Sequence, residues 1–181
     1  VEFHVTKQKQ RGNIWKFDVY NEGSGSVSWP SLGTKLFTAG DTTTGTPQAI
    51  TGGISIGKHP DGLGSLIFFG TGKYFENNDN TFNGVSVPQV DSFYAVLDNG
   101  TTTGITRGQL HQQSFSMSGG NRTSSQDTVA YTGTEKGWYI DLLDGSAKRG
   151  ERVISTPVLY GDRIIFVSII PLSGASCGGE G

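Results

Sequence analysis

A glycine-rich stretch at residues 70–74, Gly-Thr-Gly-Lys-Tyr, has the composition of a phosphate-binding loop. A P-loop carries a glycine five residues before Gly72 and a serine or threonine after the lysine, where this sequence has Ile67 and Tyr74. The turn-forming residues that follow cannot begin the helix whose amide groups would face a phosphate. We therefore predict that Gly70 and Gly72 serve the fold, because they let a buried strand turn where other backbone segments approach closely.

Residues 53–57, Gly-Ile-Ser-Ile-Gly, match the G-x-S-x-G pattern of serine hydrolases. The serine of such an elbow lies between a strand and a helix, but residues 58–60, Lys-His-Pro, follow directly, so no helix can begin there. The three histidines, His4, His59 and His111, are scattered and lack the spacing of metal ligands. We predict a chance match, no catalytic residue and no enzyme activity, with His59 in a loop or packing role.

An acidic and amide-rich segment at residues 79–84 has the spacing of the first half of a calcium-binding loop. Asp79, Thr81 and Asn83 place oxygen ligands at positions one, three and five, and a glycine follows at the sharp turn. The bidentate acid of the twelfth position is replaced by valine, although Asp91 is adjacent. The sequence therefore offers Asp79, Thr81 and Asn83 as a candidate calcium site. The alternative is a polar loop whose side chains bond their own backbone.

The overall composition indicates an all-β protein with many turns. Among 181 residues there are 28 glycines and one methionine, and only 17% of residues are charged. Helix-forming residues are scarce, whereas β-branched residues and turn formers are abundant. The net charge of -2 gives no electrostatic reason to expect nucleic acid or an anionic membrane as a partner. No transmembrane run or signal peptide is recognisable in the sequence.

Strand-like runs rich in β-branched and aromatic residues recur along the chain, bounded by Gly, Asn, Asp or Pro. They are residues 13–20, 34–40, 48–56, 65–70, 92–98, 137–143, 151–159 and 163–170. We predict a strand or irregular structure for residues 107–117. Residues 117–128 have low hydrophobicity, and we predict a long exposed loop there.

A weak internal repeat places an aromatic residue three positions before an aspartate in residues 15–18 and 138–141, with a looser copy at 93–98. We expect Trp15 and Trp138 in the core, and the aspartates at strand ends, where they accept hydrogen bonds from turn amides. Repeated units of this kind suggest β-propeller blades of about four strands. The chain would hold about two to three blades, too few to close a ring, so we predict part of a larger propeller.

Seven sequence segments, in a fixed order along the chain, carry a resemblance to a known family. They are RGNIWKFDV (11–19), GKHPDG with IFFGTGKYFE (57–76), DSFYAVLDN (91–99), ITRGQL (105–110), GWYIDL (137–142), GERVISTPVL (150–159), and IIFVSIIP with CGG (164–179). This combination resembles the C-terminal domain of PilY-type proteins, the type IV pilus tip and biogenesis factors of Gram-negative bacteria. The resemblance covers nearly the whole chain.

The resemblance implies a modified β-propeller with quinoprotein-like blades and a non-enzymatic role in pilus assembly, adhesion and twitching motility. The implied location is the cell surface at the pilus tip, reached through the periplasm and the outer membrane. The implied partners are pilus components, such as pilin and minor pilins, and a host-cell receptor.

The chain departs from the family pattern at its first ten residues. The family has a calcium loop of the D-x-D/N-x-D type just before the GNIWKFD strand, but residues 1–10 hold Glu2 as their only carboxylate. We therefore assign no residue to that loop and no certain cofactor, and we treat residues 1–10 as an atypical leader of a single domain, 1–181. Cys177, the only cysteine, matches the family's cysteine before two glycines, and its partner would lie outside this chain.

Two alternative functions remain at this point. A quinoprotein-like dehydrogenase would use pyrroloquinoline quinone and calcium, and it would need an aspartate base and an aromatic-walled cofactor pocket. A carbohydrate-binding module would use exposed aromatic residues near strand ends and loops, for which the candidates are Tyr20, Trp29, Tyr74, Tyr131 and Tyr160.

Overall fold

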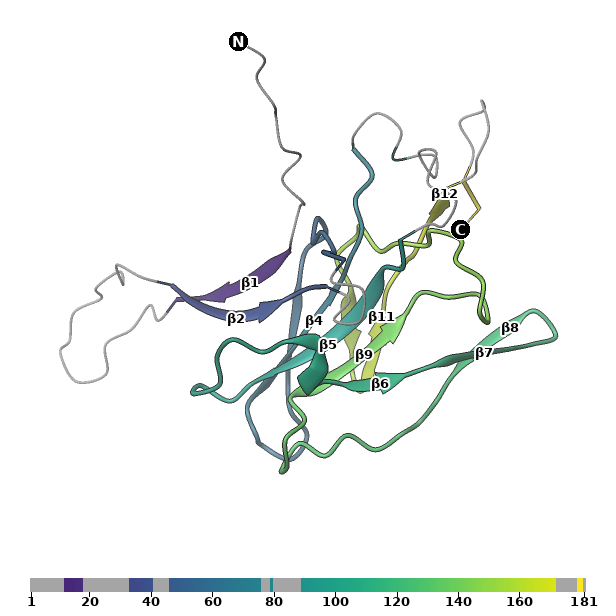
Figure 1. The fold of residues 1–181 in the computed structure, drawn as a ribbon. Helices are drawn as coiled ribbons and strands as arrows, with labels where there is room; N and C mark the ends of the chain where they lie inside the picture. Colours follow the sequence, from purple (N-terminus) through teal and green to yellow (C-terminus); the bar gives the residue numbers. More distant parts are fainter. Residues whose placement is uncertain are drawn as a thin grey trace, which may run out of the picture.

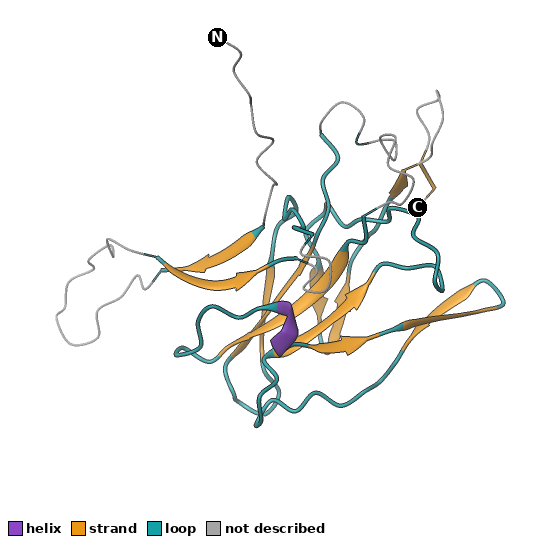
Figure 2. Cartoon of the chain, viewed as in Figure 1, coloured by secondary structure: helices purple, strands orange, loops and turns teal. Residues whose placement is uncertain are grey.

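The structure is a computed structural model that describes residues 12–17, 33–40, 46–75, 79, 89–171 and the backbone of 179–180. These residues form β-strands and one short 3-10 helix (Figures 1 and 2). The elements are β1 (Asn13–Lys16), β2 (Thr34–Thr38), β3 (Ser55–Lys58), β4 (Ser65–Gly70), β5 (Ser92–Asp98), η1 (Arg107–Gln109), β6 (His111–Gln113), β7 (Phe115–Ser118), β8 (Asn121–Ser124), β9 (Gly137–Asp141), β10 (Val158–Tyr160), β11 (Arg163–Ile165), β12 (Ile170–Pro171) and β13 (Gly179–Glu180). The prediction of an all-β fold is confirmed. None of the described helical structure is long and apolar enough to span a membrane.

A five-stranded sheet with the order β3-β4-β5-β9-β6 forms the centre of the molecule (Figure 1). Strands β3, β4 and β5 form an antiparallel meander, and β9 pairs antiparallel with β5. Strand β6 precedes β9 in the sequence but lies outside it in the sheet, as a parallel neighbour. The sheet is therefore mixed and has one strand more than the predicted blade of about four.

Strands β4 and β5 are apolar on both faces, so both faces of the sheet must be covered. On one face, Phe37 of β2 packs against Phe69 and Tyr94, with ring centroids 5.7 Å and 5.1 Å away. On the other face, Phe93 stacks on Phe166, the residue that follows β11, at 4.1 Å. The ribbon β1–β2 and the hairpin β10–β11 thus cover opposite faces of the sheet and form three layers with it.

The two glycines at the end of β4 have the structural role that the sequence predicts. A Cβ on Gly70 would overlap the side chain of Val153, and a Cβ on Gly72 would overlap that of Arg152. Gly72 also has φ of +131°, which side-chain-bearing residues rarely adopt. The backbone of Thr71 between them accepts a hydrogen bond from Val153 N–H at 2.9 Å. No helix follows these glycines in the described residues, so the phosphate-loop interpretation is excluded by the geometry.

Trp15 does not lie in the core as predicted. Its side chain is 54% exposed, whereas Ile14 beside it is buried in the first cluster. Alternation predicts which residues of a strand share a face, but it does not predict which face is buried. Here Ile14 packs into the first cluster, and Lys16, on the same side, pairs through its ammonium group with Asp98 at 2.9 Å. Trp138 is half-buried against the second cluster, so that prediction holds only in part.

The repeated aspartates have different environments. Asp98 ends β5 and accepts the Gly100 N–H at 2.9 Å, as predicted for a strand end. Asp141 ends β9 but binds side chains of other elements, described below, and not a turn. Asp18 lies outside the described residues.

Several predicted boundaries differ from the structure. Of residues 48–56 only the last two belong to a strand, and of 151–159 only the last two do. The predicted loop at 117–128 is wrong in part, because residues 115–124 form the hairpin β7–β8, with Gly119 and Gly120 at its tip in the left-handed region. A serine- and threonine-rich hairpin lacks the apolar alternation that marks a strand. The prediction of two to three blades in 1–181 stays a prediction, and the leader 1–10 lies outside the described residues.

Candidate functional site

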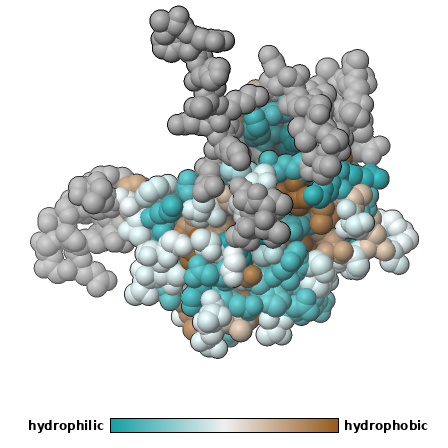
Figure 3. All heavy atoms as spheres, viewed as in Figure 1, coloured by the Kyte–Doolittle hydropathy of each residue, from teal (hydrophilic) through white to brown (hydrophobic). Residues whose placement is uncertain are grey.

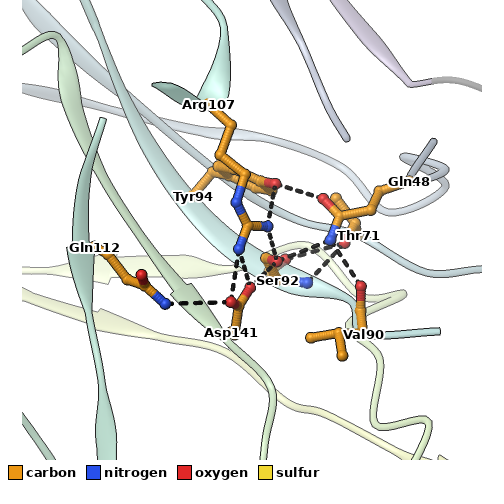
Figure 4. Close-up of polar contacts among 8 residues, drawn as sticks. All are labelled: Gln48, Thr71, Val90, Ser92, Tyr94, Arg107, Gln112 and Asp141. Carbon is orange, nitrogen blue, oxygen red and sulfur yellow. Dashed lines mark hydrogen bonds and ion pairs between the residues drawn. The ribbon is translucent and has the colours of Figure 1, made fainter. Parts of the chain in front are cut away.

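A buried network of polar side chains connects strands β5 and β9 with Arg107 of the 3-10 helix (Figure 4). Arg107 donates two hydrogen bonds of 2.6 Å from Nη2 to the carboxylate of Asp141. Its Nη1 donates to Ser92 Oγ at 3.0 Å and to Tyr94 Oη at 3.3 Å. The guanidinium carbon of Arg107 lies 3.9 Å from the ring centroid of Tyr139, so the guanidinium group also makes a cation–π contact with this ring.

The network extends beyond the arginine to a buried amide. Gln48 donates from Nε2 to Ser92 Oγ and to the carbonyl of Val90, both at 2.8 Å. Its Oε1 accepts a hydrogen bond from Tyr94 Oη. Ser92 Oγ in turn donates to Asp141 Oδ1 at 2.6 Å. Burial raises the pKa of Tyr94 to about 12, so this hydroxyl remains a hydrogen-bond donor at neutral pH.

The members of this network are buried or half-buried and satisfy one another's hydrogen-bonding groups. Among the described residues no buried side-chain nitrogen or oxygen lacks a hydrogen-bond partner. Ser92 and Tyr94 are fully buried, so no substrate can approach their hydroxyl groups. A satisfied buried network fixes the relative positions of the elements that supply its members. This cluster was not predicted from the sequence, although Arg107 and Asp141 lie within two of the sequence segments that carry the family resemblance.

The residues that match the G-x-S-x-G pattern lie at and before the start of a strand and do not form a hydrolase elbow. Ser55 begins β3, where it pairs with Phe68, and no hydrogen bond joins it to a histidine in the described part of the chain. His59 is buried, with its ring 4.4 Å from that of Tyr131, and its Nδ1 accepts the Asp61 N–H at 3.2 Å. His59 therefore has the packing role that was predicted. His111 pairs with Glu135 at 2.7 Å.

The candidate calcium ligand Asp79 is buried and engaged by its own surroundings. Its Oδ2 accepts the Phe75 N–H at 3.0 Å, and Lys73 Nζ lies 3.3 Å from Oδ1. Thr81 and Asn83 lie outside the described residues. The described residues contain no group of three or more His, Cys, Asp or Glu side chains suited to a metal ion. Calcium at this loop stays a prediction, which a calcium titration of the chain and of its Asp79→Asn variant would test.

The three sugar-stacking candidates that lie within the described residues do not form one group. Tyr74 and Tyr160 are exposed on different elements, whereas Tyr131 is half-buried against His59. Tyr20 and Trp29 lie outside the described residues. Cys177 also lies outside them.

The fold and the seven sequence segments are those of a known family. A family model described as the PilY1 beta-propeller domain matches residues 6–127. The chain belongs to the PilY1 β-propeller family. The chain is thus part of a β-propeller, and the prediction of the fold class is confirmed.

Individual relatives support the same family. The chain is 33% identical over 184 aligned residues to the type IV pilus biogenesis factor PilY1 homolog of Xylella fastidiosa, covering 94% of this chain and 12% of that protein. It is 28% identical to type IV pilus biogenesis factor PilY1 of Pseudomonas aeruginosa PAO1, covering 89% of this chain and 17% of that protein. The crystal structure of the Pseudomonas aeruginosa PilY1 C-terminal domain superposes with a TM-score of 0.64 and 30% identity, covering 76% of this chain and 32% of that one. The chain therefore spans less than a fifth of the length of these two curated relatives.

Proposed function

We propose that this chain is a non-enzymatic part of a type IV pilus-associated protein and acts in pilus biogenesis. The observation that supports this function is the similarity to PilY1 proteins along 94% of the chain. The buried Arg107–Asp141 network is consistent with a structural role, since its polar groups bind one another. Pilus components are the proposed partners, and the cell surface at the pilus tip is the proposed location, reached through the periplasm and outer membrane.

The proposed function includes a role in adhesion and in twitching motility. Both roles depend on contacts that a surface-exposed domain makes with pilus components or with a host-cell receptor. The exposed hairpin β7–β8 and the aromatic side chains outside the core are surfaces available for such contacts.

A pair of glycine variants in the parent gene tests the role in biogenesis. Gly72→Ala forces a Cβ into Arg152 at a positive φ, whereas a Cβ at Gly108 meets nothing within 4 Å. We expect the Gly72→Ala strain to lose surface pili, adherence and twitching, and the Gly108→Ala strain to keep them. The readouts are electron microscopy of pili, adherence to cultured cells and the diameter of the twitching zone.

An in-frame deletion of residues 1–181 from the parent protein gives the decisive comparison. Normal piliation, adherence and twitching in that strain, with the remaining protein present at its usual level, would contradict the proposed function. If the Gly72→Ala strain alone has a normal phenotype, the fold tolerates the alanine. An unchanged melting temperature of the purified variant would then confirm this tolerance.

A further inference from the structure

A cavity of about 660 Å³ lies on the face of the central sheet that the hairpin β10–β11 partly covers. This volume is within the range of roughly 300–1,000 Å³ that small-molecule sites occupy. Four aromatic side chains contribute to its walls: Phe115, Tyr131, Trp138 and Phe166. All four are partly exposed, so their rings are accessible to a ligand while their other sides pack against the second cluster.

The aromatic rings of this cavity, which we call the aromatic pocket, are held in place by the fold. Phe166 stacks on Phe93 with an interplanar angle of 11°. Tyr131 meets the ring of His59 edge-on, at an interplanar angle of 80°. Because the rings are fixed before a ligand arrives, binding does not require them to lose further conformational freedom.

The rim of the aromatic pocket is polar and is likewise fixed. Gln113 donates to the carbonyl of Asp127 at 2.7 Å, and its Oε1 accepts from Ser125 Oγ at 2.6 Å and from Asp127 N–H at 3.2 Å. These bonds hold the backbone of the rim segment but do not use the side chains of Gln126 and Asp127. Both residues line the pocket, and their side chains make no hydrogen bond to another described residue, so these groups are available to a ligand.

The charges around the pocket select against one class of ligand. Asp61 and Asp127 line it, and no lysine or arginine does so among the described residues. Arg122 lies 4.7 Å from the ring centroid of the pocket wall Phe115, but its charge is paired with Glu151. Like charges without a counter-charge disfavour an anionic ligand. Flat aromatic faces combined with carboxylate and amide groups suit a ring that is apolar on its faces and rich in hydroxyl groups at its edge.

We propose that the aromatic pocket binds a neutral saccharide. The sugar rings stack on Tyr131 and Trp138, and their hydroxyl groups donate to Asp127 and Gln126. A cationic side chain would use the rings and carboxylates but would leave the amide of Gln126 without a matching group. This proposal extends the adhesive part of the proposed function, on which it rests for its biological meaning, but the binding itself is measured without pili.

Isothermal titration calorimetry with the purified 181-residue chain tests the proposal. The neutral probes are maltotetraose, cellotetraose and chitotetraose, the anionic probe is a hyaluronan tetrasaccharide, and the cationic probe is a trimethyllysine peptide. We expect at least one neutral probe to bind, with the anionic probe at least about tenfold weaker.

Matched variants separate the pocket from the rest of the surface. Tyr131→Ala should weaken binding at least about tenfold, which corresponds to about 1.4 kcal/mol, whereas Tyr160→Ala, which removes an exposed ring outside the pocket, should leave it unchanged. Asp127→Ala serves as a second variant because its exposed side chain can be removed without opening the core.

Three outcomes would overturn the proposal. The first is that no neutral probe binds at about 10 mM, a concentration at which a ligand with a Kd of about 1 mM would nearly saturate the site. The second is that folded Tyr131→Ala or Asp127→Ala binds a neutral probe as tightly as the native chain does. The third is that the cationic probe alone binds. A variant that binds no sugar, in a strain that still makes pili, would leave the proposed role in biogenesis intact. The two proposals can therefore be contradicted independently of each other.

Discussion

Asp91 is a carboxylic acid that the fold stabilises in its protonated form. It lies just before β5, is 6% exposed, and accepts a hydrogen bond from Thr71 Oγ1 at 3.0 Å. Burial raises its pKa from 3.8 to about 6, against the opposing effects of that hydrogen bond and of the charge of Arg152. The environment of this residue therefore favours the neutral acid over the carboxylate.

The raised pKa of Asp91 predicts a pH-dependent stability. Because the folded state holds this proton more tightly, the stabilising effect is full below about pH 4 and is lost as the pH rises through about 6. The loss amounts to about 3 kcal/mol. Asp91→Asn removes it, so the free energy of unfolding of this variant relative to the native chain should rise between pH 4 and pH 7 in urea denaturation. Asp162→Asn, at a side chain that is 95% exposed, should show no such trend, and a constant difference for Asp91→Asn would contradict the prediction.

The structural role of a single residue could be predicted from the sequence where that role depends on its immediate neighbours in the chain. Gly70 and Gly72 were predicted correctly, since a glycine pair at the end of an apolar run indicates a turn under close packing. The partnership of Arg107 with Asp141 was not predictable, because these residues are 34 positions apart and meet only through sheet pairing. The outward position of Trp15 was missed for the same reason, since the inward face of β1 carries Ile14 and Lys16, whose partners lie far away in the sequence.

The hairpin β7–β8 is attached to the rest of the molecule by an ion pair. Arg122 on β8 donates to both carboxylate oxygens of Glu151, at 2.8 Å and 2.9 Å, and its guanidinium carbon lies 4.7 Å from the ring centroid of Phe115. Glu151 is only 2% exposed and also accepts from Ser168 Oγ at 2.6 Å. The hydrogen bond from Arg122 to Glu151 raises the pKa of the guanidinium group, consistent with a pair held firmly together.

Removing the arginine leaves a buried carboxylate without its counter-charge. We expect Arg122→Ala to lower the free energy of unfolding by about 3 kcal/mol and to expose the hairpin to protease cleavage near residues 118–121. Arg163→Ala, whose side chain is 83% exposed, should change stability by less than about 0.5 kcal/mol. Urea denaturation and limited proteolysis provide the measurements, and partial recovery in Arg122→Ala/Glu151→Gln would confirm that the carboxylate causes the loss.

The existence of elements was easier to predict than their pairing. Strands β4 and β5 were located correctly because their apolar runs are long and bounded by turn residues. The hairpin β7–β8 was predicted to be a loop because it lacks an apolar pattern of its own and is held by a contact with the distant residue Glu151. The parallel pairing of β6 with β9 has no local sequence signal, since it joins segments that are separated by the whole hairpin.

At the scale of the whole molecule, the hairpin β10–β11 has two apolar faces. Leu159 and Ile164 point toward the central sheet, whereas Val158 and Ile165 point outward and are more than half exposed. Val167, just after β11, continues this outer face. Hydrophobic surface is also visible between hydrophilic regions on the side drawn in Figure 3. A strand pair that is apolar on both faces is typical of a layer covered on both sides, as in stacked propeller blades.

The outer face of β10–β11 predicts self-association of the isolated chain. We expect the purified chain to bind the dye ANS and to sediment as species larger than a monomer. Replacing Val158, Ile165 and Val167 by threonine keeps β-branched side chains, so it should restore the monomer and change the melting temperature by only about 2–4 °C. Met117→Thr, at an exposed apolar residue on the hairpin β7–β8, should leave association unchanged. A monomeric native chain that binds no ANS would contradict the prediction.

The strand order of the central sheet also has a consequence in time. Within the described sheet β6 pairs with β9 alone, and β9 follows it in the chain after an intervening hairpin. During synthesis the meander β3–β4–β5 can therefore pair as soon as it emerges, whereas the backbone groups of β6 remain exposed to water until β9 has been synthesised. At about 5–20 residues per second this delay lasts about one to five seconds. For that interval the nascent chain presents an open strand to water, and a chaperone arriving then would meet β6 before its partner does.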